Sequence, residues 1–172
     1  KLLVQLIDKL KPDVVFLQEI KCQNNEFPDI LKNYNFVING QKGRHGVAIL
    51  VKKSIPFKEL NFDSDILNHQ ARICGININN NLNMNLINVY SPNGNPLDNK
   101  EKFDFKIRWL DELILVIKNL IKERKNVILA GDFNVLDDMK DVEDFENWRN
   151  DALGNEVSRQ KFRELLFSGL TN

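Results

Sequence analysis

The chain has 172 residues, of which 42% are hydrophobic and 28% are charged, and its formal net charge is zero. This length and apolar content suffice for one domain with a real core. A neutral chain has no global positive field that attracts nucleic acid, so any binding of nucleic acid has to rest on a local basic patch.

The sequence contains no signal peptide and no run of 18 apolar residues. We therefore expect a soluble, cytoplasmic protein without a membrane partner. Cys22 and Cys74 are far apart and match no metal-binding spacing, which predicts reduced thiols.

The first half of the chain alternates predicted helices and strands. Apolar residues at helical spacing predict a helix over 1–10. A continuous apolar run predicts a buried strand over 14–19. We expect a short helix near 26–33, and a pair of strands at 36–39 and 47–51.

The second half begins with strands at 73–78 and 86–89, joined by an Asn-rich tract at 79–81 that suits a hairpin. An i, i+3, i+4 apolar pattern predicts a long core-facing helix over 100–124. A strand at 127–130, an acidic loop over 137–146 and a last helix near 158–167 complete the predicted elements.

Three of the predicted strands end in polar side chains. Glu19 follows the first strand, Tyr90 enters a Ser-Pro-Asn-Gly turn, and Asp132 and Asn134 follow the last strand. Taken singly, the carboxylates suit solvated turn residues, Tyr90 suits a rim aromatic, and the Asp/Asn pair suits an Asx-turn. Together, at one rim, they would form an oxygen-ligand site for Mg²⁺ or Mn²⁺, which suits the hydrolysis of phosphate esters.

Three ordered motifs resemble the exonuclease III family, the bacterial abasic-site endonuclease branch of the endonuclease/exonuclease/phosphatase superfamily. They are Leu17–Lys21, Asn88–Gly94 and Gly131–Asn134. The resemblance continues through further segments, namely Gly40–Gly43, Gly46–Leu50, Gln70–Arg72 and Glu156–Thr171. It implies an α/β sandwich of two packed mixed sheets flanked by helices.

The resemblance also implies a role for each matching residue. Glu19 corresponds to the metal-binding glutamate, and Tyr90 to the tyrosine that contacts the scissile phosphate. Asp132 corresponds to the aspartate that activates or orients the attacking water, and Asn134 to the asparagine that holds this water and the phosphate. We count Glu19, Asp132 and Asn134 as candidate metal ligands, and Tyr90, Asp132 and Asn134 as candidate catalytic residues.

A DNA-binding patch is predicted in the Gly-rich basic loop at 40–46, where the backbone can approach a phosphate. Its candidate residues are Gln41, Lys42 and Arg44, with Asn93 across the rim. The predicted enzyme is a metal-dependent DNA repair phosphodiesterase that cleaves 5′ to abasic sites and trims 3′ ends. Its predicted partners are abasic duplex DNA and 3′ ends, and it is expected to be monomeric.

The sequence also departs from the family pattern. It begins within the first helix, without the family's first strand, and it lacks the C-terminal segments that complete the site. We therefore expect a single partial domain over 1–172, incomplete at both ends and less stable than a full-length enzyme. Two alternatives stay open: an incomplete fragment that only binds DNA, and a sister phosphoesterase with another substrate.

Overall fold

The structure, a computed structural model of the chain, describes residues 2–28, 31–79 and 83–171. The chain forms two compact units. The sheet unit comprises Lys1–Asn61, Gln70–Tyr90 and Ile128–Gly131, and the helical unit comprises Phe62–His69, Ser91–Val127 and Asp132–Asn172. The predicted single domain over 1–172 stays a prediction.

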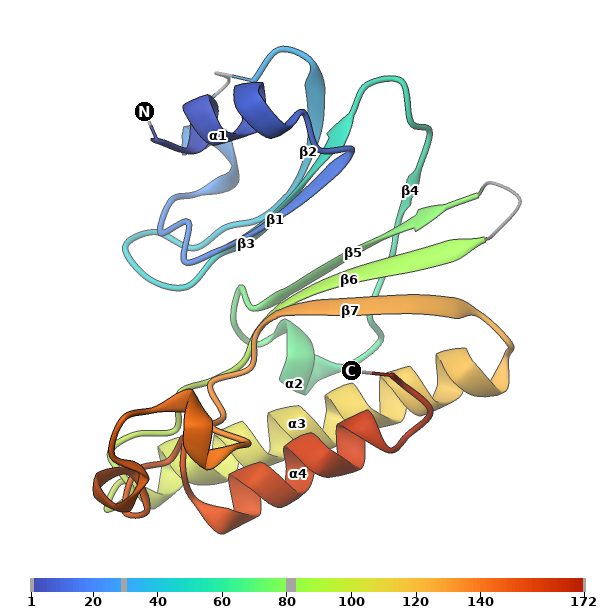
Figure 1. The fold of residues 1–172 in the computed structure, drawn as a ribbon. Helices are drawn as coiled ribbons and strands as arrows, with labels where there is room; N and C mark the ends of the chain where they lie inside the picture. The colour runs from blue at the N-terminus through green and yellow to red at the C-terminus, as the bar shows by residue number, and fades with distance from the viewer. Residues whose placement is uncertain (1, 29–30, 80–82, 172) are drawn as a thin grey trace. The chain divides into compact units, whose positions relative to one another are not determined.

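The sheet unit contains two sheets (Figure 1). The first has the order β1-β3-β2, and its elements are β1 (Val14–Gln18), β2 (Tyr34–Asn39) and β3 (Val47–Lys52). Both of its strand pairs are antiparallel, with Phe16 opposite Ile49 and Val37 opposite the same residue. The second sheet has the order β4-β5-β6-β7, and its elements are β4 (Lys58–Glu59), β5 (Ile73–Ile78), β6 (Met84–Tyr90) and β7 (Asn126–Asp132).

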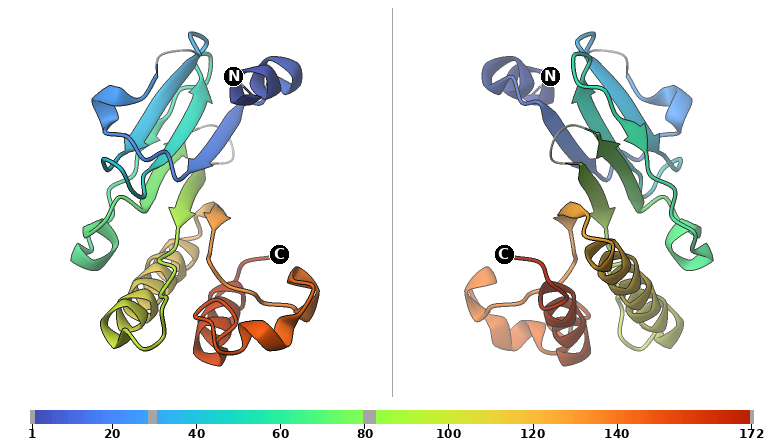
Figure 2. Two further views of the ribbon diagram at one scale, coloured as in Figure 1. Left: turned by 90° about the vertical axis from the view of Figure 1, so that its left-hand side faces the viewer. Right: turned by 90° about the vertical axis from the view of Figure 1, so that its right-hand side faces the viewer.

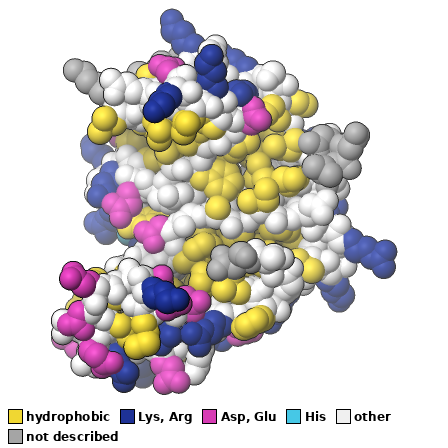
Figure 3. Space-filling view, viewed as in Figure 1, with side chains coloured by type: hydrophobic (Ala, Val, Ile, Leu, Met, Phe, Trp, Pro, Cys, Tyr) yellow, Lys and Arg dark blue, Asp and Glu magenta, His cyan; other side chains and the backbone are white. Residues whose placement is uncertain are grey.

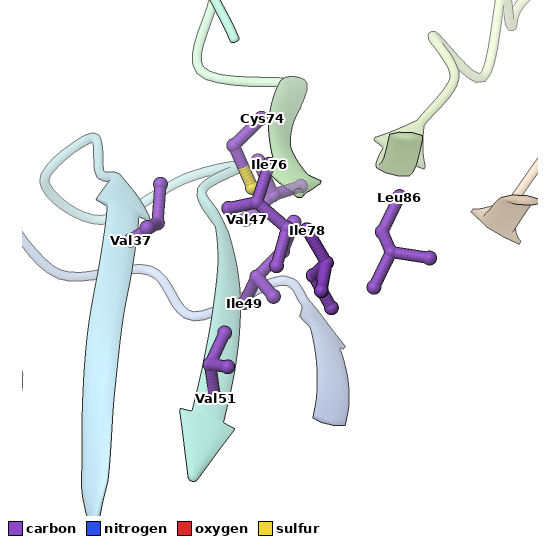
Figure 4. Close-up of a cluster of buried hydrophobic side chains, with 8 residues drawn as sticks. All are labelled: Val37, Val47, Ile49, Val51, Cys74, Ile76, Ile78 and Leu86. Atoms are coloured by element: carbon purple, nitrogen blue, oxygen red, sulfur yellow. The ribbon is translucent and has the colours of Figure 1, made fainter. Parts of the chain in front are cut away.

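Strand β3 lies at the centre of the sheet unit because it is apolar on both faces. Successive side chains of a strand point to opposite faces. Val47, Ile49 and Val51 pack in a cluster with residues of the second sheet (Figure 4), among them Cys74, Ile76, Ile78 and Leu86. Ala48 and Leu50 pack in a second cluster with Ile7 of helix α1 (Leu2–Leu10). The predicted α/β class with two packed sheets is confirmed.

The helical unit contains α2 (Asp65–Asn68), α3 (Lys100–Lys122) and α4 (Glu156–Leu166), and α3 packs against both of the others (Figure 2). The side chain of Asn99 caps α3 by accepting a hydrogen bond from the Lys102 backbone N–H. The acidic segment folds into two short 3₁₀ turns, at Met139–Asp141 and Phe145–Trp148. No helix in the described ranges is long and apolar enough to cross a membrane.

One predicted helix is wrong. Instead of a helix near 26–33, the described residues there contain the end of a 3₁₀ turn at Asn24–Glu26 and then non-helical backbone. Pro28 explains the break at Phe27, since a proline disfavours helical backbone in the residue before it, and Phe27 is extended with φ −66° and ψ 126°. The other predicted helices and strands are present, with ends that shift by a few residues. The hairpin turn predicted at 79–81 lies largely outside the described residues.

An apolar groove of about 500 Å³ opens within the sheet unit. It lies at β1 and β7, the outermost strands of their respective sheets, and hydrophobic side chains remain visible on this face (Figure 3). Ile128 of β7 keeps 47% of its surface exposed. The lining residues are Asp13, Val14, Phe16, Ile55, Ile78, Met84, Leu86 and Ile128.

Candidate functional site

Glu19 and Tyr90 meet in the sheet unit, although they are 71 residues apart in the sequence. The Tyr90 hydroxyl donates a hydrogen bond of 2.6 Å to Oε1 of Glu19. The other carboxylate oxygen, Oε2, lies 2.7 Å from Nζ of Lys21. Lys21 and the Tyr90 hydroxyl together hold the pKa of Glu19 below its ordinary value. The carboxylate is therefore ionised at neutral pH and open to solvent.

Asn88, a fully buried residue of β6, fastens this strand to the first sheet. Its Nδ2 donates to the backbone carbonyls of Leu17 and Ala48, each at 2.9 Å. Its Oδ1 accepts a hydrogen bond of 2.6 Å from the side chain of Gln18. Because Glu19 directly follows Gln18 in the chain, this network positions the carboxylate beside the end of β6. Asn88 was part of a recognised motif, but the sequence indicated no role for its side chain.

Arg72 is a buried cation beneath the Glu19–Tyr90 pair. Its guanidinium lies 4.8 Å from the centre of the Tyr90 ring and donates to the Tyr90 carbonyl at 3.1 Å. The His45 ring also lies near the Tyr90 ring, with 6.2 Å between ring centres. Burial, with Arg72 and Arg44 nearby, lowers the pKa of His45 to about 4, although Glu19 acts in the opposite direction. His45 is therefore neutral at pH 7.

The predicted DNA-binding loop at 40–46 is joined to the segment that carries Glu19. The backbone N–H of Lys21 donates to the His45 carbonyl, and that of Gly43 donates to the Lys21 carbonyl, both at 3.0 Å. Lys42 and Arg44 are exposed, whereas the side chain of Gln41 accepts a long hydrogen bond of 3.5 Å from the Ala71 backbone. The loop thus presents two cations on the same unit as the Glu19 carboxylate.

Asp132 and Asn134 form a turn in the helical unit. Oδ1 of Asp132 accepts a hydrogen bond of 2.8 Å from the Asn134 backbone N–H, as in an Asx-turn. Nδ2 of Asn134 donates to the Ser91 carbonyl at 2.9 Å, and its Oδ1 lies 3.4 Å from Nδ2 of Asn93. The local Asx-turn interpretation is thus correct as far as it goes. The second carboxylate oxygen of Asp132, Oδ2, takes no part in this turn. Among the hydrogen bonds of the described residues, its contact is a long one of 3.5 Å to Nδ2 of Asn134.

The structure therefore arranges the predicted site residues in two sets. Glu19, Tyr90, Gln41, Lys42 and Arg44 belong to the sheet unit, where Glu19 and Tyr90 are in direct contact. The second set, in the helical unit, consists of Asn93, Asp132 and Asn134. Its members form a connected series of hydrogen bonds. Their assignment to catalysis, metal binding and DNA binding stays a prediction.

Sequence reasoning missed three residues that hold these sets in place. Asn88 and Arg72 support the Glu19–Tyr90 pair, and the buried Lys106 contacts the turn that contains Asn134. A polar residue inside an apolar run was the available signal for Asn88. Likewise, Lys106 falls between apolar positions of a core-facing helix. Buried polar groups of this kind are informative because they are costly unless they are hydrogen-bonded.

Two packed sheets, with carboxylate, phenol and amide groups at the strand ends, are the features expected of an α/β phosphoesterase. Residues 1–171 match the profile of the Endonuclease/Exonuclease/phosphatase family, and the chain belongs to that family. It is 31% identical over 134 residues to exodeoxyribonuclease III of Haemophilus influenzae, an alignment that covers 76% of the chain and 50% of that protein. It is 26% identical over 164 residues to an exodeoxyribonuclease of Bacillus subtilis, covering 93% of the chain and 62% of that protein.

Solved structures agree with the sequence relatives. An AP endonuclease from Archaeoglobus fulgidus is similar with a TM-score of 0.85 at 28% identity, covering 96% of the chain and 64% of that structure. A 3′ phosphatase from Neisseria, bound to a product DNA hairpin, is similar with a TM-score of 0.81 at 29% identity, covering 99% and 66%. The chain thus spans about half to two-thirds of the length of these relatives.

Proposed function

We propose that the chain carries the site of a metal-dependent DNA phosphodiesterase that cleaves 5′ to abasic sites and trims 3′ ends. The observation that carries the proposal is the Glu19–Tyr90 contact, which joins an ionised carboxylate to a phenol at two strand ends. The names of the relatives support the substrate class, since they include exodeoxyribonuclease III and an AP endonuclease. A similar structure contains product DNA.

The donor atoms of the site fit a hard divalent cation. The candidate ligands Glu19, Asp132 and Asn134 offer only oxygen atoms, and Glu19 is ionised and exposed. In the part of the chain that the structure describes, no group of three or more His, Cys, Asp or Glu side chains could hold a metal. Mg²⁺ needs only one or two carboxylates from a protein, because water and substrate phosphate complete its shell. When bound, Mg²⁺ or Mn²⁺ would stabilise negative charge on the phosphoryl oxygens.

Three site residues would perform the other steps of the proposed hydrolysis. The Tyr90 hydroxyl, which donates to Glu19 in the structure, would donate a hydrogen bond to a phosphate oxygen once Glu19 binds the cation. The Asp132 carboxylate would align a water molecule for attack on phosphorus, as a general base does. Asn134 has an oriented amide, because Ser91, Asp132 and Asn93 all contact its polar atoms. It would hold the water and the phosphate in place.

The exposed Lys42 and Arg44 would contribute DNA affinity through the phosphate backbone. Such contacts release counterions from DNA, so affinity should fall as salt concentration rises. Gln41 and Asn93 would add hydrogen bonds to the same backbone. This patch has to be local, because the formal net charge of the chain is zero.

A cleavage assay with a labelled duplex that carries one abasic site tests the proposal. We expect nicking by the wild-type chain in Mg²⁺, loss of nicking in EDTA, and a decrease of roughly 10²–10⁴-fold for Asp132→Ala. The exposed Glu143, on the acidic segment, gives a matched control, and Glu143→Ala should cleave as the wild type does. If the wild-type chain gives no metal-dependent cleavage, the proposed activity is wrong for this chain.

Two further substrates in the same assay separate this proposal from the two alternative functions. A duplex with a 3′-phosphate end and an inositol phosphate are offered under the same conditions. Release of phosphate from inositol phosphate without DNA cleavage would favour a sister phosphoesterase. Salt-sensitive DNA binding without turnover of any substrate would instead favour a chain that only binds DNA.

A further inference from the structure

Lys106 of α3 is fully buried, at 0% exposure. Its ammonium donates hydrogen bonds to three backbone carbonyls: those of Asn93 at 3.1 Å, Asn134 at 2.7 Å and Ala152 at 3.0 Å. The three acceptors belong to the turn that follows β6, the turn that follows β7 and the segment before α4. One positive charge therefore joins three segments of the helical unit that are distant in the sequence.

This arrangement is not an ion pair. Among the ion pairs of the described residues, none involves Lys106, and the carboxylates of Asp151 and Asp132 act on it only at longer range. Burial lowers the pKa of Lys106 to about 8. Burying an ammonium is costly, and here three backbone carbonyls offset that cost by accepting its hydrogen bonds. Two of the three bonded segments contain candidate site residues, Asn93 and Asn134, so the ammonium acts directly on the geometry of these turns.

The segment with the shortest of the three bonds also has a constrained backbone. Asn134 has a φ of 49°, in the left-handed region, which costs about 1–2 kcal/mol for a residue with a Cβ atom. Such a conformation persists where the surroundings determine it strongly. Here Lys106 holds the Asn134 carbonyl, Ser91 accepts from its amide, and Asp132 accepts from its backbone N–H.

The same contacts constrain the candidate catalytic carboxylate. Asp132 lies two residues before Asn134, and its Oδ1 is bonded to the Asn134 backbone N–H. A shift of the Asn134 backbone would therefore turn the Asp132 carboxylate as well. The Asn93 carbonyl is held by the same ammonium, so one side chain joins the two asparagine turns.

We propose that Lys106 is a positioning residue. Its ammonium holds the Asn93 and Asn134 turns in fixed positions relative to each other and thereby sets the orientation of the Asp132 carboxylate. The inference rests on the proposed function, because it assigns a purpose to the geometry of the candidate catalytic residues. Lys106 itself, being fully buried, would touch neither DNA nor the reacting phosphate.

Kinetics of Lys106→Met, which keeps the volume and removes the charge, test the inference on the abasic duplex. We expect kcat to fall about 100-fold, the loss that a misplacement near 1 Å produces, while KM changes less than about threefold. Lys102 lies on the same helix and is exposed, so Lys102→Met is the matched control and should keep the wild-type kcat. An unchanged kcat in Lys106→Met, or a loss that only follows the unfolded fraction, overturns the inference.

A second variant separates the charge of Lys106 from its volume. Lys106→Ala leaves a cavity that n-butylammonium can enter, and n-butanol offers the same shape without the charge. We expect the ammonium to restore cleavage and the alcohol to leave it low. Equal effects of the two compounds would mean that volume, and not charge, is what the turn requires, and the inference would be wrong.

Side-chain amide resonances provide a readout without activity. In ¹H–¹⁵N spectra we expect the amide signals of Asn93 and Asn134 to shift and to exchange faster with water in Lys106→Met than in Lys102→Met. If the wild-type chain cleaves no substrate, the proposed function fails, yet these spectra still decide whether Lys106 holds the turns. If the wild type cleaves and the signals stay unchanged in Lys106→Met, the inference alone fails.

Discussion

Gly94 provides a quantitative test of how tightly the turn after β6 is packed against α3. It is buried, with a φ of +85°. A Cβ atom at this position would lie 2.7 Å from Cδ of Lys106 and 3.2 Å from Cβ of Ala152. The lysine stem cannot easily move aside, because its ammonium is bonded to three carbonyls.

Gly94→Ala should therefore incur two separate losses of stability. The left-handed conformation costs about 1–2 kcal/mol for a residue with a Cβ atom. Overpacking a filled site costs about 1–3 kcal/mol more. Gly43 serves as the control, because its φ is +72° and an added Cβ would meet no atom within 4 Å. Gly43→Ala should thus incur the first loss alone, about 1–2 kcal/mol.

Urea titration measures the free energy of unfolding of Gly94→Ala and of Gly43→Ala. Both tryptophans of the chain, Trp109 and Trp148, belong to the helical unit, so their fluorescence reports on the surroundings of Gly94. Far-UV circular dichroism reports on both units. Equal losses for the two variants would contradict the reasoning, because they would show that the Lys106 stem yields without cost.

Three further predictions concern the sheet unit. Asn88→Leu leaves two buried carbonyls and one side-chain amide without their partner, and it should lower the free energy of unfolding by about 1–3 kcal/mol for each group left unsatisfied. Urea titration measures this, and a loss under 1 kcal/mol would argue against a buried network. Burial lowers the pKa of His45 from about 6.5 to about 4. As pH falls below about 6.5, the unfolded state therefore binds a proton before the folded state does. The free energy of unfolding should decline between about pH 6.5 and 4. His45→Gln should flatten this decline in pH-dependent unfolding, and an unchanged slope would contradict the assignment. Burial raises the pKa of Cys74 to about 12, so iodoacetamide at pH 8 should label the half-buried Cys22 well before Cys74, and equal labelling rates by mass spectrometry would refute that.

The sequence by itself determined most of the secondary structure, because the signals involved are local. The apolar run of β3 predicts a strand buried on both faces, and all five residues from Val47 to Val51 are fully buried. The apolar stripe of α3 predicts a long helix, and Leu110, Leu113 and Ile117 are buried as that pattern requires. The prediction failed near 26–33, where the chain is extended at Phe27, the residue before Pro28.

The motifs likewise identified the strand ends, since Glu19, Tyr90, Asp132 and Asn134 all follow or close predicted strands. What no local pattern contains is the partner of each polar group. The hydroxyl of Tyr90 meets Glu19, 71 residues away along the chain, only because β1 and β6 are brought together.

Only the tertiary structure decides the hydrogen-bond partners of the buried polar residues. Asn88 finds its acceptors 40 and 71 residues away, and Lys106 finds its own 13, 28 and 46 residues away. Periodicity reports whether a position faces the core, because that depends on neighbours within a turn or two of the backbone. Periodicity cannot show which carbonyl accepts the hydrogen bond of a buried side chain, because that depends on how distant segments pack. The sequence therefore places Lys106 among the apolar positions of a core-facing helix, and only the folded chain shows its ammonium between two turns of the candidate site.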